Sequence, residues 1–277
     1  FGIFAIAGVT GIVLHFGEVE AFAKIVKRAE PFWLMLAIAL QLSTYVSVAA
    51  GWSAVLIEAG SPQPLAKLMR IAVSKLFADQ AVPSAGMGGN VVLVNQLAAL
   101  GVPRGNAVAA LLVSMIGFYA AFAAMAVLMM LLLWIDHKAT ALMAGVVTAF
   151  LFVAFSIPSL ALWLRHRGSE PLPSKLEHIA PVRMLLALMA DAPATLVKNR
   201  RLILKVTGLN ALIFVADSIT LWVCLRAIGE HAPFTAAFIA LVMAQIVAAI
   251  GLIPLGLGSF EATATAMLHL LGIPLES

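Results

Sequence analysis

Three carboxylates stand within or beside very apolar stretches of the chain, and they are its strongest candidates for a chemical role. Asp79 and Glu261 each border a segment rich in glycine and proline, and Asp217 lies inside an apolar run. A carboxylate inside a membrane is costly and is rarely found there without a role. Glu261 could cap its own helix, pair with a cationic lipid headgroup or carry a proton.

The other two acids have alternatives of their own. Asp217 could act as an intramembrane charge facing the interior of a helical bundle, or form a buried hydrogen-bonded pair with a residue such as Asn210 or Gln245. Asp79 follows Lys75 by four residues, so the two side chains can pair on one helix face.

Two breaks interrupt the apolar runs next to Asp79 and Glu261. They read P-S-A-G-M-G-G-N at 83–90 and P-L-G-L-G-S-F-E at 254–261. Proline ends the preceding helix, and glycine lets the backbone turn and approach closely. Each break then starts a new half-helix, whose N-terminus favours an anion such as phosphate. The sequence thus predicts a lipid-headgroup site at Pro83, Ser84, Gly86, Gly88, Gly89, Asn90, Pro254, Gly256, Gly258, Ser259 and Glu261. The alternative is that the glycines only permit tight helix packing.

The two breaks repeat each other 171 positions apart, without a gap. Pro83 corresponds to Pro254, and the motif L-x-x-L-G-x-P recurs at 97–103 and 268–274. Repeated, interrupted hydrophobic segments are typical of transporters built from structural repeats, with the binding site at the breaks. We expect one membrane domain over 1–277, with repeat 1 at about 1–134 and repeat 2 at about 140–277. The last transmembrane helix of repeat 2 is expected to lie beyond Ser277.

Composition requires a membrane protein. Of the 277 residues 63% are hydrophobic and 11% charged, and the mean hydropathy is +1.06. A helix needs roughly 20 apolar residues to cross the hydrocarbon core. Segments of that kind are predicted at about 31–57, 107–134, 140–164 and 202–228, with a trimmed one at about 1–16.

The remaining apolar segments are short, and they come in pairs around the breaks. These pairs are 65–82 with 90–100, and 234–252 with 260–271. We expect each pair to form a re-entrant helical hairpin that enters and leaves on one side. The predicted fold is therefore an all-α integral membrane bundle with inverted repeats and two re-entrant hairpins.

Charge gives the orientation. The loop 165–205 holds eight of the 17 Lys and Arg residues, and four more lie around the first hairpin. Basic loops stay in the cytoplasm, so we expect 165–205 to be cytoplasmic. The spans at 31–57 and 202–228 then run in opposite directions, which makes the repeats inverted. The net charge of +4 is too small and scattered to indicate nucleic-acid binding.

Enzyme and metal motifs are absent from the sequence. There is no H-E-x-x-H, G-x-S-x-G or P-loop, and the single cysteine gives no metal cluster. We expect no catalytic residues, no metal and no cofactor. One alternative is an intramembrane hydrolase that uses Ser259 and His269, which requires the two side chains to be in hydrogen-bond contact.

The breaks carry a family resemblance. P-L-G-L-G-S-F-E-A at 254–262, with L-L-G-I-P at 270–274, resembles the P-G-G-L-G-x-x-E signature of a flippase-like transmembrane family. That family includes the membrane domain of lysylphosphatidylglycerol synthases. The segment 83–90 resembles its first motif, and Trp52, Leu56 and Gly60 also fit. Leu255 replaces a family glycine, and Asn90 and Leu93 replace the acid and arginine usual in the first motif, which argues against a lipid-phosphate contact there.

The resemblance implies a multi-pass protein of the bacterial cytoplasmic (inner) membrane that binds a polar phospholipid or glycolipid and moves it between leaflets. Membrane lipids would be its partners. The alternative is a membrane scaffold or regulatory subunit for a lipid-modifying enzyme, which would then be a protein partner. Aminoacyl transfer is not implied, because no synthase domain is attached.

Overall fold

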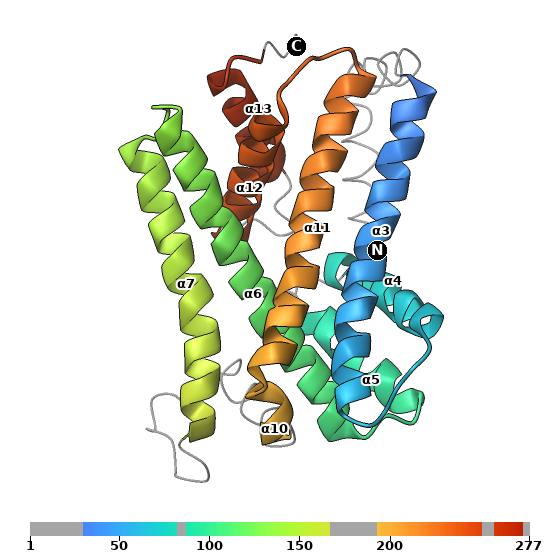
Figure 1. The fold of residues 1–277 in the computed structure, drawn as a ribbon. Coiled ribbons are helices and arrows are strands. Elements are labelled where there is room, and N and C mark those ends of the chain that lie inside the picture. Colours follow the sequence, from blue (N-terminus) through green and yellow to red (C-terminus); the bar gives the residue numbers. More distant parts are fainter. Residues whose placement is uncertain (1–29, 82–86, 167–192, 251–257, 274–277) are drawn as a thin grey trace, which may run out of the picture.

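The computed structural model describes residues 30–81, 87–166, 193–250 and 258–273, and every regular element in these ranges is a helix (Figure 1). The helices are α3 (Pro31–Glu58), α4 (Leu65–Ala81), α5 (Met87–Ala99), α6 (Arg104–Ile135), α7 (Ala141–His166), α10 (Ala194–Val197), α11 (Arg200–Ala227), α12 (Phe234–Ile250) and α13 (Ser259–Leu270). The predicted all-α class is confirmed for this part of the chain. The predicted segment at 1–16 lies outside the described residues.

Among the described residues, three helices are long and apolar enough to cross a membrane. They are α3 and α11, with 28 residues each, and α6, with 32 residues. At 1.5 Å per residue they extend about 42 to 48 Å, more than the roughly 30 Å of hydrocarbon. They agree with the predicted spans at 31–57, 107–134 and 202–228 to within a few residues, whereas the predicted span at 140–164 falls on α7 and is not among the three. The exposed surface carries large apolar side chains, including Phe32, Met35, Leu142 and Phe152, as a lipid-facing surface would.

The helices α3 and α11 pack antiparallel along their whole length. At one end the Glu30 N–H donates to the Ala227 carbonyl at 3.1 Å. At the other end Asn199 Nδ2 donates to Glu58 Oε1 at 3.1 Å. The helices α3 and α11, which correspond to each other in the two predicted repeats, thus run in opposite directions.

The helix α6 crosses behind this pair and approaches α11 closely at Gly117. A Cβ at Gly117 would lie 2.8 Å from Val206 Cγ1 and 3.2 Å from the Thr207 backbone nitrogen. Beyond this crossing the rings of Phe118, Phe122 and Phe214 gather, and the Phe122 and Phe214 centroids are 4.9 Å apart. The crossing therefore requires a residue without a side chain.

Four short helices form two packed pairs, α4 with α5 and α12 with α13. They have 17, 13, 17 and 12 residues. The longest of them extends only about 26 Å, which is shorter than the hydrocarbon core. The pairs lie at opposite ends of the bundle, with α4 and α5 where α3 ends and α12 and α13 where α11 ends (Figure 1).

Hydrogen bonds tie each pair to a different end of α6. Near the start of α6, Asn106 Nδ2 donates to the Ala59 carbonyl at 3.2 Å and to Ser61 Oγ at 2.9 Å, which ties the turn before α4 to the residues after α5. Beyond the end of α6, Lys138 Nζ donates to the Leu271 carbonyl after α13 at 3.3 Å. The two pairs are therefore attached at opposite ends of one 32-residue helix.

The repeated motif L-x-x-L-G-x-P makes the same turn in both copies. Gly101 and Gly272 have φ of 84° and 90°, a region that favours glycine. The following N–H donates back to Leu97 in the first copy, at 3.1 Å, and to Leu268 in the second, at 3.0 Å. The sequence repeat thus corresponds to equal local structure.

Candidate functional site

A carboxylate joins the two helices of the first pair. Asp79, in the last turn of α4, accepts a 2.6 Å hydrogen bond from Lys75 Nζ through Oδ2. Its Oδ1 accepts a 3.0 Å bond from the backbone N–H of Gly89, the third residue of α5. The predicted Lys75–Asp79 pair is present, and the bond to Gly89 was not foreseen. Asp79 therefore neutralises the positive N-terminal end of α5.

The hydrogen bond between Asp79 and the backbone of residue 89 requires a glycine at that position. A Cβ at Gly89 would overlap the carboxylate of Asp79. The helix α5 begins at Met87, so the predicted half-helix start at Asn90 is wrong by three residues. Gly88, Gly89 and Asn90 belong to the first turn of α5 rather than to the break, because the carboxylate gives this N-terminus a hydrogen-bond acceptor.

A second carboxylate caps the second pair. Gly258 precedes α13 with φ of 80°, and its N–H donates to Glu261 Oε2 at 2.8 Å. Ser259 begins the helix, and Glu261 is its third residue with an exposed side chain. The sequence leaves three roles open to Glu261, and the structure shows one of them, the capping of its own helix α13.

Both helix N-termini are thus occupied by the protein's own acids. An incoming phosphate would have to displace Asp79 from Gly89, or Glu261 from Gly258. Asp79 is already paired with Lys75, so of the two carboxylates only that of Glu261, whose side chain is exposed, favours the cationic or hydrogen-bond-donating part of a headgroup. The structure therefore argues against the prediction that the N-termini of α5 and α13 attract an anion.

Asp217 is the third acid, and it lies where three helices meet. Gln41 of α3 and Gln245 of α12 are the polar side chains beside its carboxylate. Within the described residues, the buried Asp217 Oδ1 and Gln245 Oε1 have no hydrogen-bond partner. Asn210, the other partner considered in the sequence, donates to the Val206 carbonyl of its own helix at 2.9 Å. Of the two partners considered in the sequence, Gln245 rather than Asn210 lies beside Asp217.

Each of these two buried acceptor atoms calls for a donor, which a proton, a water or a lipid headgroup can supply. Gln41 could not be found from sequence, because only the antiparallel packing of α3 on α11 brings it to Asp217. Ser218 and Thr220, beside Asp217 in the chain, donate to carbonyls of their own helix at 2.7 and 2.8 Å. They leave Asp217 without a hydroxyl donor.

Only some of the remaining predicted site residues lie in the described parts of the chain. Pro83, Ser84, Gly86, Pro254 and Gly256 lie outside the described residues. Among the described parts, α4 and α5 pack on α3 and α6, while α12 and α13 pack on α6, α7 and α11. A single pocket shared by the two breaks stays a prediction.

The hydrolase alternative fails on geometry. Ser259 begins α13 and His269 stands ten residues later in the same helix. Ten residues of helix separate them by about 15 Å along the axis, too far for the hydrogen bond that a Ser–His pair needs. In the described parts of the chain, no three His, Cys, Asp or Glu side chains form a group that could hold a metal ion.

Comparison with known proteins gives one match. The family model for the lysylphosphatidylglycerol synthase TM region matches residues 1–277, the whole chain. No curated protein and no solved structure matched.

Proposed function

We propose a lipid-translocating function for this chain, which belongs to the family of lysylphosphatidylglycerol synthase transmembrane regions. The chain would bind a polar phospholipid or glycolipid and carry its headgroup between the leaflets, while the acyl chains stay in the bilayer. It would act in the bacterial cytoplasmic membrane, with the loop 165–205 in the cytoplasm.

The arrangement of helices supports inverted repeats. The series α3, α4, α5 and the series α11, α12, α13 have similar lengths in the same order, and α3 runs antiparallel to α11. Each short pair is hydrogen-bonded to residues at a different end of α6. Pairs too short to cross would enter the membrane as re-entrant hairpins from opposite faces.

Polar groups at the hairpins and between them would receive the headgroup. Asp79 and Glu261 mark the two hairpins, and Asp217 with Gln41 and Gln245 lies on the helices between them. Irregular backbone at membrane depth is tolerated only beside protein or a water-filled cavity. The single observation that carries the proposal is the pair of short hairpins at opposite ends of an apolar bundle, each with a carboxylate at its break.

A flipping assay tests the proposal. The purified chain is reconstituted in phosphatidylcholine vesicles with a fluorescent phospholipid, and an impermeant quencher reports the rate at which labelled lipid changes leaflet. We expect faster exchange than in protein-free vesicles, and loss of at least about tenfold of this acceleration in Asp217→Asn, equivalent to roughly 1.4 kcal/mol of a barrier.

The matched control is Asp136→Asn, because Asp136 is exposed in the loop between α6 and α7. It should flip at the rate of the unchanged protein. A second pair of variants separates charge from capping: Glu261→Gln keeps an acceptor oxygen for the Gly258 N–H, whereas Glu261→Ala removes it. No acceleration by the unchanged protein, or full activity in both Asp217→Asn and Glu261→Ala, would refute the proposed roles.

A further inference from the structure

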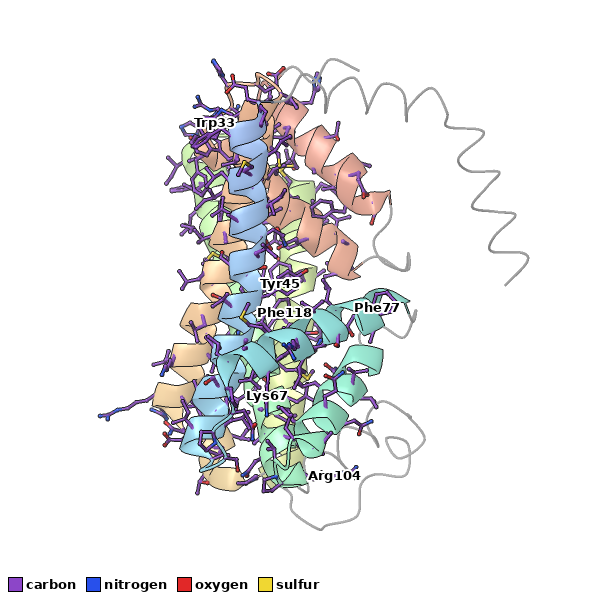
Figure 2. The ribbon with its side chains drawn as sticks, turned by 90° about the vertical axis from the view of Figure 1, so that its right-hand side faces the viewer. Trp33, Tyr45, Lys67, Phe77, Arg104 and Phe118 are labelled. Carbon is purple, nitrogen blue, oxygen red and sulfur yellow. The ribbon has the colours of Figure 1, made fainter. Side chains whose placement is uncertain are left out.

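A groove of about 320 Å³ lies between the two helices of the first pair, away from the carboxylate that joins them. It is lined by Lys67, Arg70 and Ile71 of α4 and by Gln96, Ala99 and Leu100 at the end of α5. Lys67 and Arg70 are three residues apart, so both charges stand on one face of α4. In Figure 2 Lys67 lies near the start of α4 and Phe77 near its far end.

The two cations of the groove have no counterion in the described part of the chain. Both side chains are exposed, and no ion pair there involves either of them. The acid on the same helix, Asp79, is already held by Lys75 and by the Gly89 N–H. Lys67 and Arg70 therefore present two uncompensated positive charges.

Apart from Gln96, the other residues that line the groove are apolar. Ile71 forms its buried floor and Leu100 packs against the same core. On the outer surface of α4, Val73 and Phe77 are 54% and 73% exposed, as residues in contact with lipid would be. A fitting occupant has an anionic head for the cations and an apolar tail for the floor.

The groove has no counterpart on the second pair. The positions 171 residues after Lys67, Arg70 and Gln96 are Phe238, Leu241 and Met267, and all three are buried. The basic groove thus stands only at the end of the bundle where α3 ends and α11 begins. Arg200 and Arg201 open α11 at that end, so it is the more basic end of the described structure.

We infer that this groove binds one anionic phospholipid, with its phosphate on Lys67 and Arg70 and an acyl chain against Ile71 and Leu100. Basic residues at a membrane surface attract anionic lipids of the leaflet they face. The lipid stays bound at the side of the first hairpin and is not the transported one. Lipid binding in this groove is independent of the proposed transport, because an equilibrium binding measurement detects it without any movement of lipid between the leaflets.

Native mass spectrometry of the full chain, released from neutral detergent with added phosphatidylglycerol, tests the inference. We expect one tightly held phosphatidylglycerol, and affinity about 30-fold lower in Lys67→Gln/Arg70→Gln, as two lost surface cations predict. The control Arg200→Gln/Arg201→Gln removes two exposed charges at the same end outside the groove and should keep that lipid.

A steric variant covers the case in which the charge variant is misfolded. Ala99→Trp fills the groove without removing a charge, and it should also release the lipid. Inorganic phosphate or glycerol 3-phosphate at millimolar excess should not displace it, and phosphatidylcholine should bind weakly. Displacement by free phosphate, equal binding of phosphatidylcholine, or retention in both groove variants would overturn the inference.

Discussion

Replacing Gly89 by alanine should weaken the junction between α4 and α5. The new Cβ would lie 2.6 Å from Asp79 Oδ2 and closer still to Oδ1. The carboxylate would have to move away and give up its bond to the Gly89 N–H. A hydrogen bond to a charged group contributes about 1.5 to 3 kcal/mol, and alanine in a helix returns up to about 1 kcal/mol. We expect a net loss of about 1 to 2 kcal/mol of unfolding free energy.

A double-mutant cycle attributes this loss to one contact. In an Asp79→Ala background the obstructing carboxylate is gone, so Gly89→Ala should become neutral or stabilise by up to about 1 kcal/mol. The difference between the two backgrounds, about 1 to 3 kcal/mol, is the coupling between position 89 and the Asp79 carboxylate. It is measured by denaturant unfolding in detergent micelles.

The matched control is Gly208→Ala. Gly208 is a helical glycine of α11 whose Cβ would meet nothing within 4 Å. Its replacement should leave stability unchanged or raise it, since only helix propensity changes. An equal effect of Gly89→Ala with and without Asp79, or no effect in either background, would refute the reasoning.

Substitutions at three further positions test the second pair of short helices and the helix crossing by unfolding in micelles. Gly258→Ala should cost roughly 1 to 2 kcal/mol, because φ of 80° disfavours a side chain, and equal stability would contradict the positive φ. Glu261→Ala should cost about 1 kcal/mol through the lost cap, and Glu261→Gln clearly less, so identical losses would exclude capping. Gly117→Ala should cost about 1 to 3 kcal/mol because α6 and α11 are too close for its Cβ, and a neutral result would mean that the crossing is looser.

The sequence predicted the elements better than their contacts. Apolar length located α3, α6 and α11, and the repeated prolines and glycines located both pairs of short helices, because these features are local. The Lys75–Asp79 pair was also predictable, since four residues of helix determine it. The start of α5 was misplaced, because glycines were interpreted as a break where a distant carboxylate supports a helical turn.

The site itself depends on packing between helices. Gln41 reaches Asp217 only through the register of α3 against α11, and no spacing along the chain encodes that register. The occupation of both helix N-termini by Asp79 and Glu261 likewise follows from folded geometry. The three carboxylates stand out in the sequence as candidates, whereas Gln41 and the Gly89 N–H become their neighbours only through the fold.

Cysteine labelling in sealed vesicles tests the central claim most directly. In a Cys224→Ser background, single cysteines replace Pro62 and Pro103 at the two ends of the first pair, and His231 and His269 at the ends of the second; all four positions are exposed. With an impermeant thiol reagent, we predict that 62 and 103 react from one side and 231 and 269 from the other. Labelling of 62 and 103 from opposite sides, or of all four from the same side, would contradict two hairpins entering from opposite faces.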